Sequence, residues 1–453
     1  MTKILLENLQ LPNGQVLDNR FFKSAMSETL ADSQGAPSDD LIALYDFWAK
    51  QGMGVLVTGN VMVDGRYLGE PGNVVLDSDD HLAQFRKWAA VGKKNGVPIW
   101  LQLNHPGKQM YRSINQTPIA PSAIPISGGS ASAFRPPREM TVFDIKEARD
   151  KFIAAGLRAK AAGFTGVQLH AAHGYLINQF LSPADNQRTD RYGGSLDNRM
   201  RFLVEVYQGL RDKVGPDFTI ALKLNASDFK EEGFGFEDCK HVVKTMSDLG
   251  IDLIEISGGN YETPVFGSDY ENGAGFVTYA LALADLTSVP IVSTGGFRKV
   301  TQMEEAIKDG VSMIGLARPF VLRPSLVNDY RQDGDLQLTT PRLTTGLPKL
   351  DKALGPIIGV SYYEAQMKRL AKGKSVTVSH NAWPYLLQTV KVHGLSALSA
   401  SKRLLCRFQI NLPLPFMPWL LSISFKTSNV SPARFWQTVF KPIPLSFARC
   451  YLV

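Results

Sequence analysis

Residues 163–175 read Gly-Phe-Thr-Gly-Val-Gln-Leu-His-Ala-Ala-His-Gly-Tyr, and they show the unit from which the chain is built. The amphipathic stretch Asp144–Ala162 comes before them, and Gly163 is placed to end that helix as a C-cap. A short apolar run follows, as expected of a buried parallel strand, and polar residues come where the strand ends. We therefore predict a helix, then a strand, with chemically active side chains at the carboxyl end of the strand.

This unit recurs along the chain, with long amphipathic stretches such as Leu196–Val214 between short apolar runs, and with Gly250 and Gly310 again just before strands. Eight parallel strands with intervening helices are typical of an α/β fold, the closed (β/α)8 TIM barrel. The predicted strands are Phe21–Met26, Val55–Val63, Pro98–His105, Gly166–His173, Thr219–Ser227, Leu253–Gly259, Pro290–Gly295 and Met313–Ala317.

Three additions to the barrel are expected. Asn13-Gly14 between alternating apolar residues predicts an N-terminal hairpin that plugs the bottom of the barrel. The insert Pro106–Met140, rich in Pro, Ser and Gly, predicts a lid between the third strand and its helix. We divide the chain into a barrel at residues 1–345, a C-terminal helical extension at 346–394 and a basic apolar tail at 395–453.

The charge is unevenly distributed. The net charge is +7, but no acidic residue follows Glu364, whereas 12 Lys and Arg residues do. Residues 1–364 carry 37 basic and 42 acidic groups, a net charge of −5, so we expect the main domain not to bind nucleic acid. The apolar stretch at 411–425 is too short and too interrupted by Pro to span a membrane. Peripheral membrane contact, a docked tail and a poorly ordered tail stay open as alternatives.

Sparse cysteines and the N-terminal sequence bear on location. Cys239, Cys406 and Cys450 form no CxxC pair, which leaves zinc, iron–sulfur and disulfide frameworks unsupported and suits a reducing cytoplasm. The first residues have no apolar segment of signal-peptide length. We therefore expect an unexported, cytoplasmic protein without a metal site.

Candidate catalytic residues follow the fourth strand. His170 and His173 are placed to donate hydrogen bonds to a carbonyl oxygen on which negative charge develops, and Tyr175 offers a phenolic proton. Two alternatives stay open: a pair of structural core histidines, and a metal site with His105 as a third imidazole.

Candidate cofactor residues follow other strands. Gly295 and Gly296 with Ala317 and Arg318 come after the last two strands, where barrel enzymes hold phosphate. Gln102 would point inward and suit the pyrimidine edge of a flavin, and a buried Lys223 would suit a reduced flavin anion, although pairing with a carboxylate is the alternative for Lys223. No G-x-G-x-x-G follows a strand, so no separate dinucleotide domain is expected.

The motifs together resemble one family over about residues 4–325. They are Asn19-Arg20, Lys23-Ser-Ala-Met-Ser-Glu28, Leu101-Gln-Leu-Asn-His-Pro-Gly-Lys-Gln109, Ala120-Pro-Ser-Ala123, His170-Ala-Ala-His-Gly-Tyr-Leu176, Phe180-Leu-Ser-Pro183 and Arg188-Thr-Asp-Arg-Tyr-Gly-Gly-Ser-Leu-Asp-Asn-Arg199. Their order and spacing are similar to those of the old yellow enzyme family, the NADH:flavin oxidoreductases.

The resemblance implies a non-covalent FMN and ping-pong transfer of hydride from NADH or NADPH to the activated C=C bond of an α,β-unsaturated carbonyl compound. His170 and His173 would bind the substrate carbonyl, and Tyr175 would protonate Cα. Ser27 stands where many relatives have Cys or Thr. The cysteines and second nucleotide domain of the dienoyl-CoA reductase branch are absent from this sequence. The implied FMN-binding residues are Ala25, Met26, Ser27, Gly59, Gln102, Lys223, Gly295, Gly296, Ala317 and Arg318.

Two other functions stay open at this point. A non-redox aldolase or isomerase would use the phosphate site and Lys223, and a non-catalytic flavin- or membrane-binding scaffold would depend on the tail. The sequence does not specify the small-molecule substrate, the choice between NADH and NADPH, or the oligomeric state.

Overall fold

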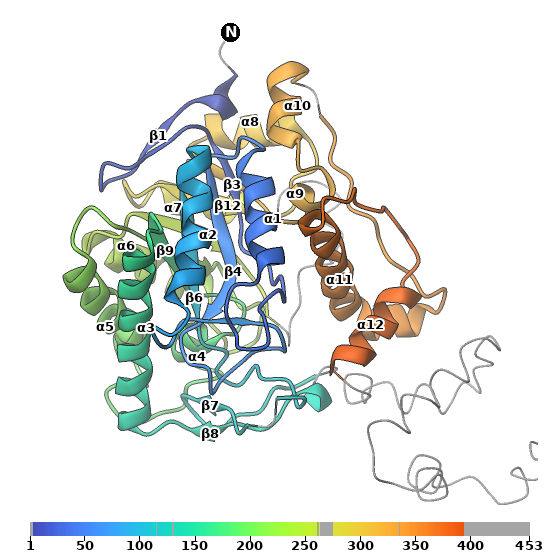
Figure 1. Ribbon diagram of the computed structural model, residues 1–453. Coiled ribbons are helices and arrows are strands. Elements are labelled where there is room, and N and C mark those ends of the chain that lie inside the picture. The colour runs from blue at the N-terminus through green and yellow to red at the C-terminus, as the bar shows by residue number, and fades with distance from the viewer. Residues whose placement is uncertain are drawn as a thin grey trace, which may run out of the picture. The chain divides into compact units, whose positions relative to one another are not determined.

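The computed structural model describes residues 3–114, 116–128, 131–260, 262, 275–334 and 336–393, and its central feature is a closed barrel of parallel strands (Figure 1). The strand β3 pairs with β13 on one side and with β4 on the other, and this double pairing closes the sheet. The TIM barrel is thus confirmed, and each strand ends slightly before its predicted limit, where the polar residues turn into loops. The barrel strands are β3 (Phe21–Lys23), β4 (Val55–Met62), β6 (Ile99–Asn104), β9 (Gly166–Ala171), β10 (Thr219–Asn225), β11 (Leu253–Ser257), β12 (Ile291–Thr294) and β13 (Met313–Leu316).

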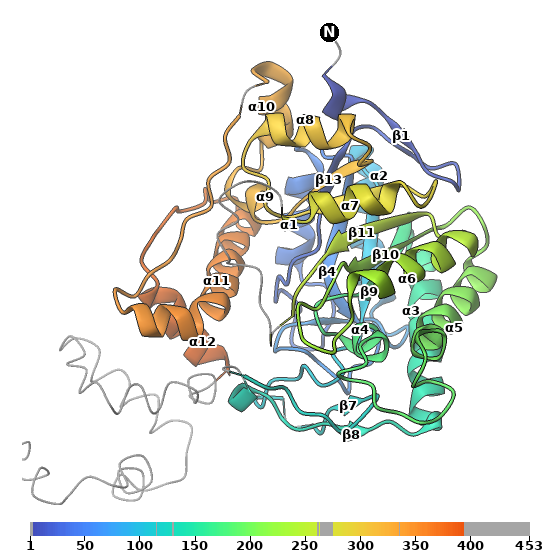
Figure 2. The same ribbon diagram turned by 180° about the vertical axis from the view of Figure 1, so that it is seen from behind.

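Helices surround the barrel (Figures 1 and 2). The helix α3 (Val142–Ala162) begins two residues before its predicted start because Thr141 and Asp144 form a capping box there, and it ends at Gly163, whose φ is 97°. The helix α5 (Leu196–Val214) has the predicted limits. The other helices are α1 (Asp39–Ala49), α2 (Leu82–Asn95), α4 (Leu176–Leu181), α6 (Phe236–Asp248), α7 (Val277–Ala284), α8 (Val300–Lys308), α9 (Arg318–Leu322), α10 (Leu326–Gln332), α11 (Pro348–Ala371) and α12 (Trp383–His393).

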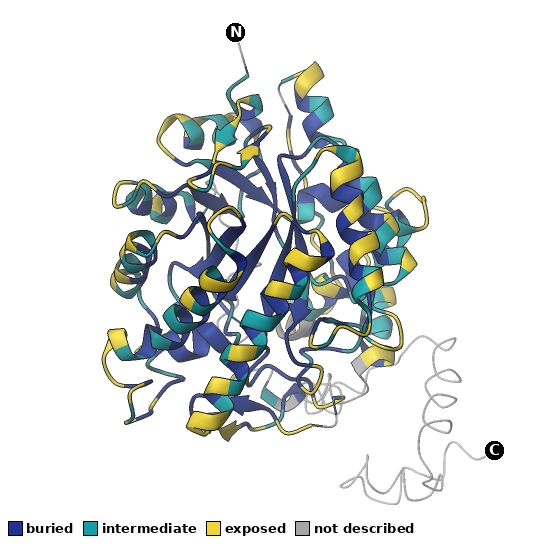
Figure 3. Ribbon diagram, turned by 60° about the vertical axis from the view of Figure 1, so that its left-hand side comes forward, coloured by how far each residue is buried: buried dark blue, intermediate teal, exposed yellow. Residues whose placement is uncertain are grey.

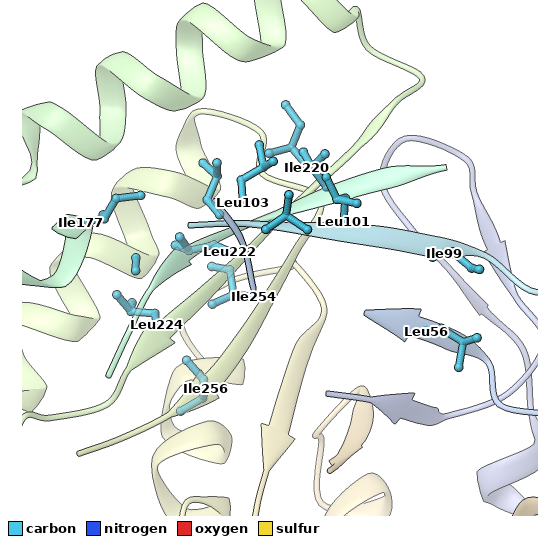
Figure 4. Packing of buried hydrophobic residues seen from close by; sticks show 14 of the residues in the cluster. Leu56, Ile99, Leu101, Leu103, Ile177, Ile220, Leu222, Leu224, Ile254 and Ile256 are labelled. Carbon is cyan, nitrogen blue, oxygen red and sulfur yellow. The ribbon is translucent and has the colours of Figure 1, made fainter. Parts of the chain in front are cut away.

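The main hydrophobic core lies between the strands and the helices. Side chains such as Leu101, Leu222 and Ile254 pack there (Figure 4). Figure 3 shows the strands buried, while the outward faces of the helices are exposed. A second, smaller cluster, which includes Phe22 and Trp100, packs together with residues of the hairpin. Burial of apolar area in both clusters fixes the strands, and hence the loops at their carboxyl ends.

The predicted hairpin closes one end of the barrel. Its strands β1 (Leu9–Gln10) and β2 (Val16–Leu17) are antiparallel. Asn13 Nδ2 donates to Thr219 Oγ1 at 2.8 Å, and Trp100 Nε1 donates to Gln15 Oε1 at 3.1 Å. Because Thr219 and Trp100 lie at the amino ends of β10 and β6, the hairpin seals the bottom of the barrel and leaves the carboxyl end for chemistry.

The remaining segments are short strands and turns in the loops, and the helices of the C-terminal extension. The insert at 106–140 contains β7 (Ile119–Ala120), β8 (Arg138–Glu139) and a 3-10 turn (Ala131–Ala133). A two-residue strand, β5 (Val74–Val75), pairs with the end of β4, and a 3-10 turn (Ile4–Leu6) precedes the hairpin. The helix α11 packs against α1 and α9, and α12 packs against α11.

The limits of the extension and of the tail stay a prediction, and the tail lies outside the described residues. Across the part of the chain that the structure describes, every helix is too short or too polar to cross a membrane.

The floor of the barrel gives the first testable prediction. Trp100 is fully buried there, so Trp100→Ala should lower the free energy of unfolding by about 3–5 kcal/mol. Phe143→Ala, which removes an aromatic ring that is 75% exposed at the start of α3, should change it by less than about 0.5 kcal/mol. Urea unfolding of both variants measures the difference, and equal losses would show that the floor does not carry this stability.

Candidate active site

The carboxyl ends of the central strands bring the predicted residues together. His170, Lys223 and Glu255 are register partners on the adjacent strands β9, β10 and β11, so their side chains lie at one level of the barrel. Gln102 and Gln168 are register partners on β6 and β9. All five side chains are buried. The sequence had suggested His170, Lys223 and Gln102 for this place, and the structure adds Glu255 and Gln168.

The two imidazoles and the phenol form one aromatic cluster. The ring of His170 lies 5.2 Å from that of His173 and 4.7 Å from that of Tyr175, centroid to centroid. His170 Nδ1 accepts a hydrogen bond from the Ala172 amide, so the neutral ring carries its hydrogen on Nε2. His173 Nε2 is 2.8 Å from Ser257 Oγ, which fixes the orientation of this ring from β11. The arrangement provides N–H donors beside a phenolic O–H.

A left-handed turn creates this cluster. His173 has a φ of 58°, which is unfavourable for a residue with a side chain, and Gly174 follows with 76°. The neighbouring loops hold the turn: Asn225 Oδ1 accepts from the His173 amide at 3.1 Å, and Gln109 Nε2 donates to the His173 carbonyl at 3.0 Å. The turn folds the chain back, so that His173 and Tyr175 face the His170 ring rather than continuing the line of the strand.

Both histidines are neutral near physiological pH. Burial lowers the pKa of His170 well below its usual range, and the nearby His173 and Lys223 lower it further. Burial and then Lys223 likewise lower the pKa of His173. Lys223 is the register partner of His170 on the adjacent strand β10, which places it next to this residue.

A buried polar belt links side chains of the strands β6, β9, β10, β11 and β12. Gln102 Nε2 donates to Gln168 Oε1 at 2.8 Å, and Gln168 Nε2 donates to Glu255 Oε2 at 2.7 Å. Glu255 Oε1 accepts from Lys223 Nζ at 2.9 Å and from Thr294 Oγ1 at 2.8 Å. From the sequence, the partner of Lys223 was either a reduced flavin or a carboxylate. In the structure, Lys223 pairs with the carboxylate of Glu255.

A second buried ion pair lies beside the segment that follows β3. Lys23 Nζ donates to the Val57 carbonyl and lies 3.8 Å from Glu28 Oε1, while burial lowers the pKa of this lysine to about 8. Glu28 also accepts from the Gly59 amide at 3.0 Å. A Cβ at Gly59 would lie 2.2 Å from Glu28 Oε2 and 2.3 Å from the Met26 carbonyl, so only glycine fits there. Met26, in the predicted segment Ala25–Ser27, therefore has its carbonyl against Gly59.

Ser27 has a partner that the sequence did not suggest. Its hydroxyl donates to Glu70 Oε1, in the loop that follows β4. Burial raises the pKa of Glu70. On α11, burial and then the negative charge of Glu70 raise the pKa of Glu364.

The loops after β12 and β13 form a corner rich in donors. Gly295 and Gly296 have φ values of 102° and 85°, and the Gly295 amide donates to the Gly315 carbonyl at 3.3 Å, which ties this left-handed pair to the end of β13. Arg318, preceded by Ala317, begins α9. Burial and then the charge of Arg318 lower the pKa of Arg298. The loops after β12 and β13 thus each carry an arginine where an anion is expected.

The helix α11 contributes Tyr363 to this corner. Burial raises the pKa of Tyr363 to about 12, and the nearby Arg318 and Arg298 oppose that rise. The Tyr363 hydroxyl is buried, and among the described residues it makes no hydrogen bond. No site residue is predicted in this helix from the sequence, which indicates only a helical extension at 346–394.

The insert that was expected to be a lid is attached by a buried ionic cluster. Lys108 Nζ lies 2.8 Å from Asp185 Oδ1 and 3.2 Å from Glu262 Oε2, and Lys230 Nζ is also 3.2 Å from Glu262. Ser127 of the insert donates to the same glutamate at 2.7 Å. The cluster joins the insert to the loops after β9, β10 and β11.

His105 does not join the imidazole pair. Its ring lies 4.9 Å from that of Tyr67, and its Nδ1 accepts from the Gly107 amide. Where the structure describes the chain, no three His, Cys, Asp or Glu side chains are grouped so that they could hold a metal ion. The metal alternative therefore gains no support from this geometry.

Comparison with known proteins identifies the family. Residues 5–337 match the model of the NADH:flavin oxidoreductase / NADH oxidase family. The chain is 35% identical over 369 residues to the NADH-dependent flavin oxidoreductase iliE of Hypocrea jecorina (strain QM6a), an alignment that covers 73% of this chain and 90% of that protein.

Solved structures agree in fold. A 2-naphthoyl-CoA reductase in complex with 2-naphthoyl-CoA superposes with a TM-score of 0.70 and 26% identity over 73% of this chain, which spans about half (52%) of that longer protein. An old yellow enzyme homologue from Zymomonas mobilis superposes with a TM-score of 0.64 and 22% identity over 75% of this chain and 95% of its own length.

The chain belongs to the NADH:flavin oxidoreductase / NADH oxidase family, and it is a flavin oxidoreductase of the old yellow enzyme type. FMN is the cofactor, and NADH or NADPH is the co-substrate. The sequence-based predictions of family, fold, enzyme class and cofactor are confirmed.

Buried histidines at the strand ends make stability depend on pH. Burial lowers the pKa of His105 to about 4, whereas an unfolded histidine titrates near 6.5. The unfolded chain therefore binds this proton first, so the stability is complete above about pH 6.5 and is lost as the pH falls towards 4.

As the pH falls from 7 to 5, the titration of His105 should lower the free energy of unfolding by about 2 kcal/mol. His105→Asn keeps an acceptor for the Gly107 amide and should reduce the pH dependence by that amount. Urea unfolding of the FMN-free proteins at pH 5, 6 and 7 measures it. An identical pH dependence in both proteins would contradict the assignment.

Proposed function

We propose that this enzyme reduces the activated C=C bond of an α,β-unsaturated carbonyl compound, using His170, His173 and Tyr175. The observation that carries the proposal is the cluster at the end of β9, where two neutral imidazoles stand beside a phenol. Neutral imidazoles donate hydrogen bonds without attracting a permanent anion, which suits a neutral carbonyl that gains negative charge only during reaction.

The geometry supports a division of labour. Because His170 Nδ1 accepts from the Ala172 amide, we assign the Nε2–H of this ring to the carbonyl oxygen of the substrate. We assign His173, whose orientation Ser257 fixes, to the same oxygen. Hydrogen bonds to this oxygen make Cβ electrophilic and stabilise the enolate-like transition state. Tyr175 then donates its proton to Cα.

The residues at the mouth of the barrel fit FMN. The left-handed Gly295 and Gly296, together with Ala317 and Arg318, suit its phosphate. Gln102 and Lys223 suit the polar edge of the ring, and the segment of Ala25, Met26 and Ser27 is held against Gly59 by the close approach of the Met26 carbonyl. When bound, FMN supplies hydride transfer, while the protein supplies position and electrostatics.

The aldolase or isomerase alternative finds no support. A Schiff-base lysine must be deprotonated to attack a carbonyl, but Lys223 Nζ donates to the buried carboxylate of Glu255, which stabilises the ammonium. The scaffold alternative concerns a tail that lies outside the described residues. Contact with a membrane and the cytoplasmic location stay predictions.

Tyr175→Phe tests the role of the phenol. The substitution should leave reduction of the bound flavin by NADH or NADPH unchanged, and it should slow flavin reoxidation by an enone about 10²-fold or more, because only that step needs the proton. Anaerobic stopped-flow measurement of the two half-reactions separates them. Equal slowing of both would show that Tyr175 does not have this role.

Tyr363→Phe tests whether α11 completes the phosphate site. The loss of one hydrogen bond to a charged group should weaken FMN binding to the FMN-free protein about tenfold, while riboflavin, which has no phosphate, should bind as before. Tyr362→Phe, on the same helix, is the matched control, since the Tyr362 hydroxyl donates to the Thr377 carbonyl, in the segment after α11. If the binding of FMN and of riboflavin weakened equally, Tyr363 would contribute only to packing and not to the phosphate site.

A further inference from the structure

The carboxylate of Glu255 has no role in the proposed mechanism, although it is the centre of the polar belt. It is fully buried and accepts three hydrogen bonds, from Lys223, Thr294 and Gln168. These donors come from three different strands of the barrel. A buried carboxylate is costly unless it is paired and fully hydrogen-bonded, as this one is.

The first consequence concerns charge. Glu255 Oε1 lies 2.9 Å from Lys223 Nζ, so the ammonium and the carboxylate together carry no net charge. Lys23, which is buried at the end of β3, likewise lies 3.8 Å from a carboxylate oxygen of Glu28. A ligand that meets Lys223 therefore meets one half of a neutral pair rather than an isolated cation.

The second consequence concerns hydrogen-bond direction. An ionised carboxylate only accepts, so Gln168 must turn its NH2 group towards Glu255. The Gln168 oxygen then faces Gln102, which must donate its own NH2 group at 2.8 Å. Among the described residues, Gln102 Oε1 accepts no hydrogen bond, so it is left to accept one from a ligand. One carboxylate thus sets the orientation of two amides in series.

We propose that Glu255 is a positioning residue that sets the charge and the hydrogen-bond polarity around the polar edge of the flavin, by compensating Lys223 and by orienting Gln102. The inference rests on the proposed placement of that edge against Gln102 and Lys223. Two-electron reduction adds negative charge to the flavin, which an uncompensated lysine would stabilise. Glu255 therefore keeps the reduction potential lower than Lys223 alone would make it.

Glu255→Gln tests this, because it removes the charge and keeps the shape. The FMN-loaded protein is equilibrated anaerobically with a reference dye, and the ratio of reduced to oxidised flavin is read from the spectrum. At a fixed dye potential the ratio should rise about tenfold, which is about 30 mV for a two-electron couple. An unchanged or a lower ratio would overturn the proposal.

A double variant keeps the test valid if Glu255→Gln alone fails to hold FMN. Lys223→Met with Glu255→Gln leaves no unpaired buried charge, and its net charge equals that of the native pair. With no uncompensated ammonium left, its ratio should not rise above the wild-type ratio. A tenfold rise would contradict charge compensation.

Asp252→Asn is the matched control, a carboxylate-to-amide change just before β11. Asp252 is buried and accepts from Arg211 Nη2 at 2.5 Å, away from the belt, so this variant should lose stability and keep its flavin ratio. A tenfold rise in that ratio would mean that loss of any buried carboxylate has the same effect, and the proposal would fall. The dye experiment needs no enone, so a failed ene-reduction would leave this result standing.

Discussion

The pairing of β3 with both β4 and β13 is the constraint on which the rest of the structure depends. Register pairs such as Phe22 with Val55 and Ile314 with Phe21 close the sheet, although β3 has only three residues. Closure forces all eight carboxyl ends to surround one mouth, while the hairpin fills the opposite end. The groups around that mouth come from strands far apart in sequence, and no single segment could assemble them.

Electrostatic balance is the second organising feature. Two lysines buried in the barrel strands each lie against a glutamate, Lys23 against Glu28 and Lys223 against Glu255. Burial together with Lys223 keeps the imidazoles neutral. The protein thus presents hydrogen-bond donors and compensated pairs rather than isolated charges. Such a site responds to charge that develops during a reaction, which is where stabilisation accelerates chemistry.

The sequence predicted the barrel well because each strand is a short apolar run that ends in polar or glycine residues. His170, His173 and Tyr175 were found by their motif, and their proximity in space agrees with it. Glu255 was missed although it alternates with Ser257 on one face of a strand, because its partner depends on the register between strands. The contribution of Tyr363 could not be predicted, since it depends on how α11 packs. The left-handed backbone of His173 depends on contacts from neighbouring loops.

The account stands on hydride transfer to a conjugated C=C bond at this mouth. The most direct measurement mixes the FMN enzyme, first reduced anaerobically with one equivalent of NADH or NADPH, with one equivalent of 2-cyclohexen-1-one. The account predicts that the oxidised flavin spectrum returns while one equivalent of cyclohexanone forms. A flavin that stays reduced in the presence of this and other enones, yet is promptly reoxidised by oxygen, would contradict it.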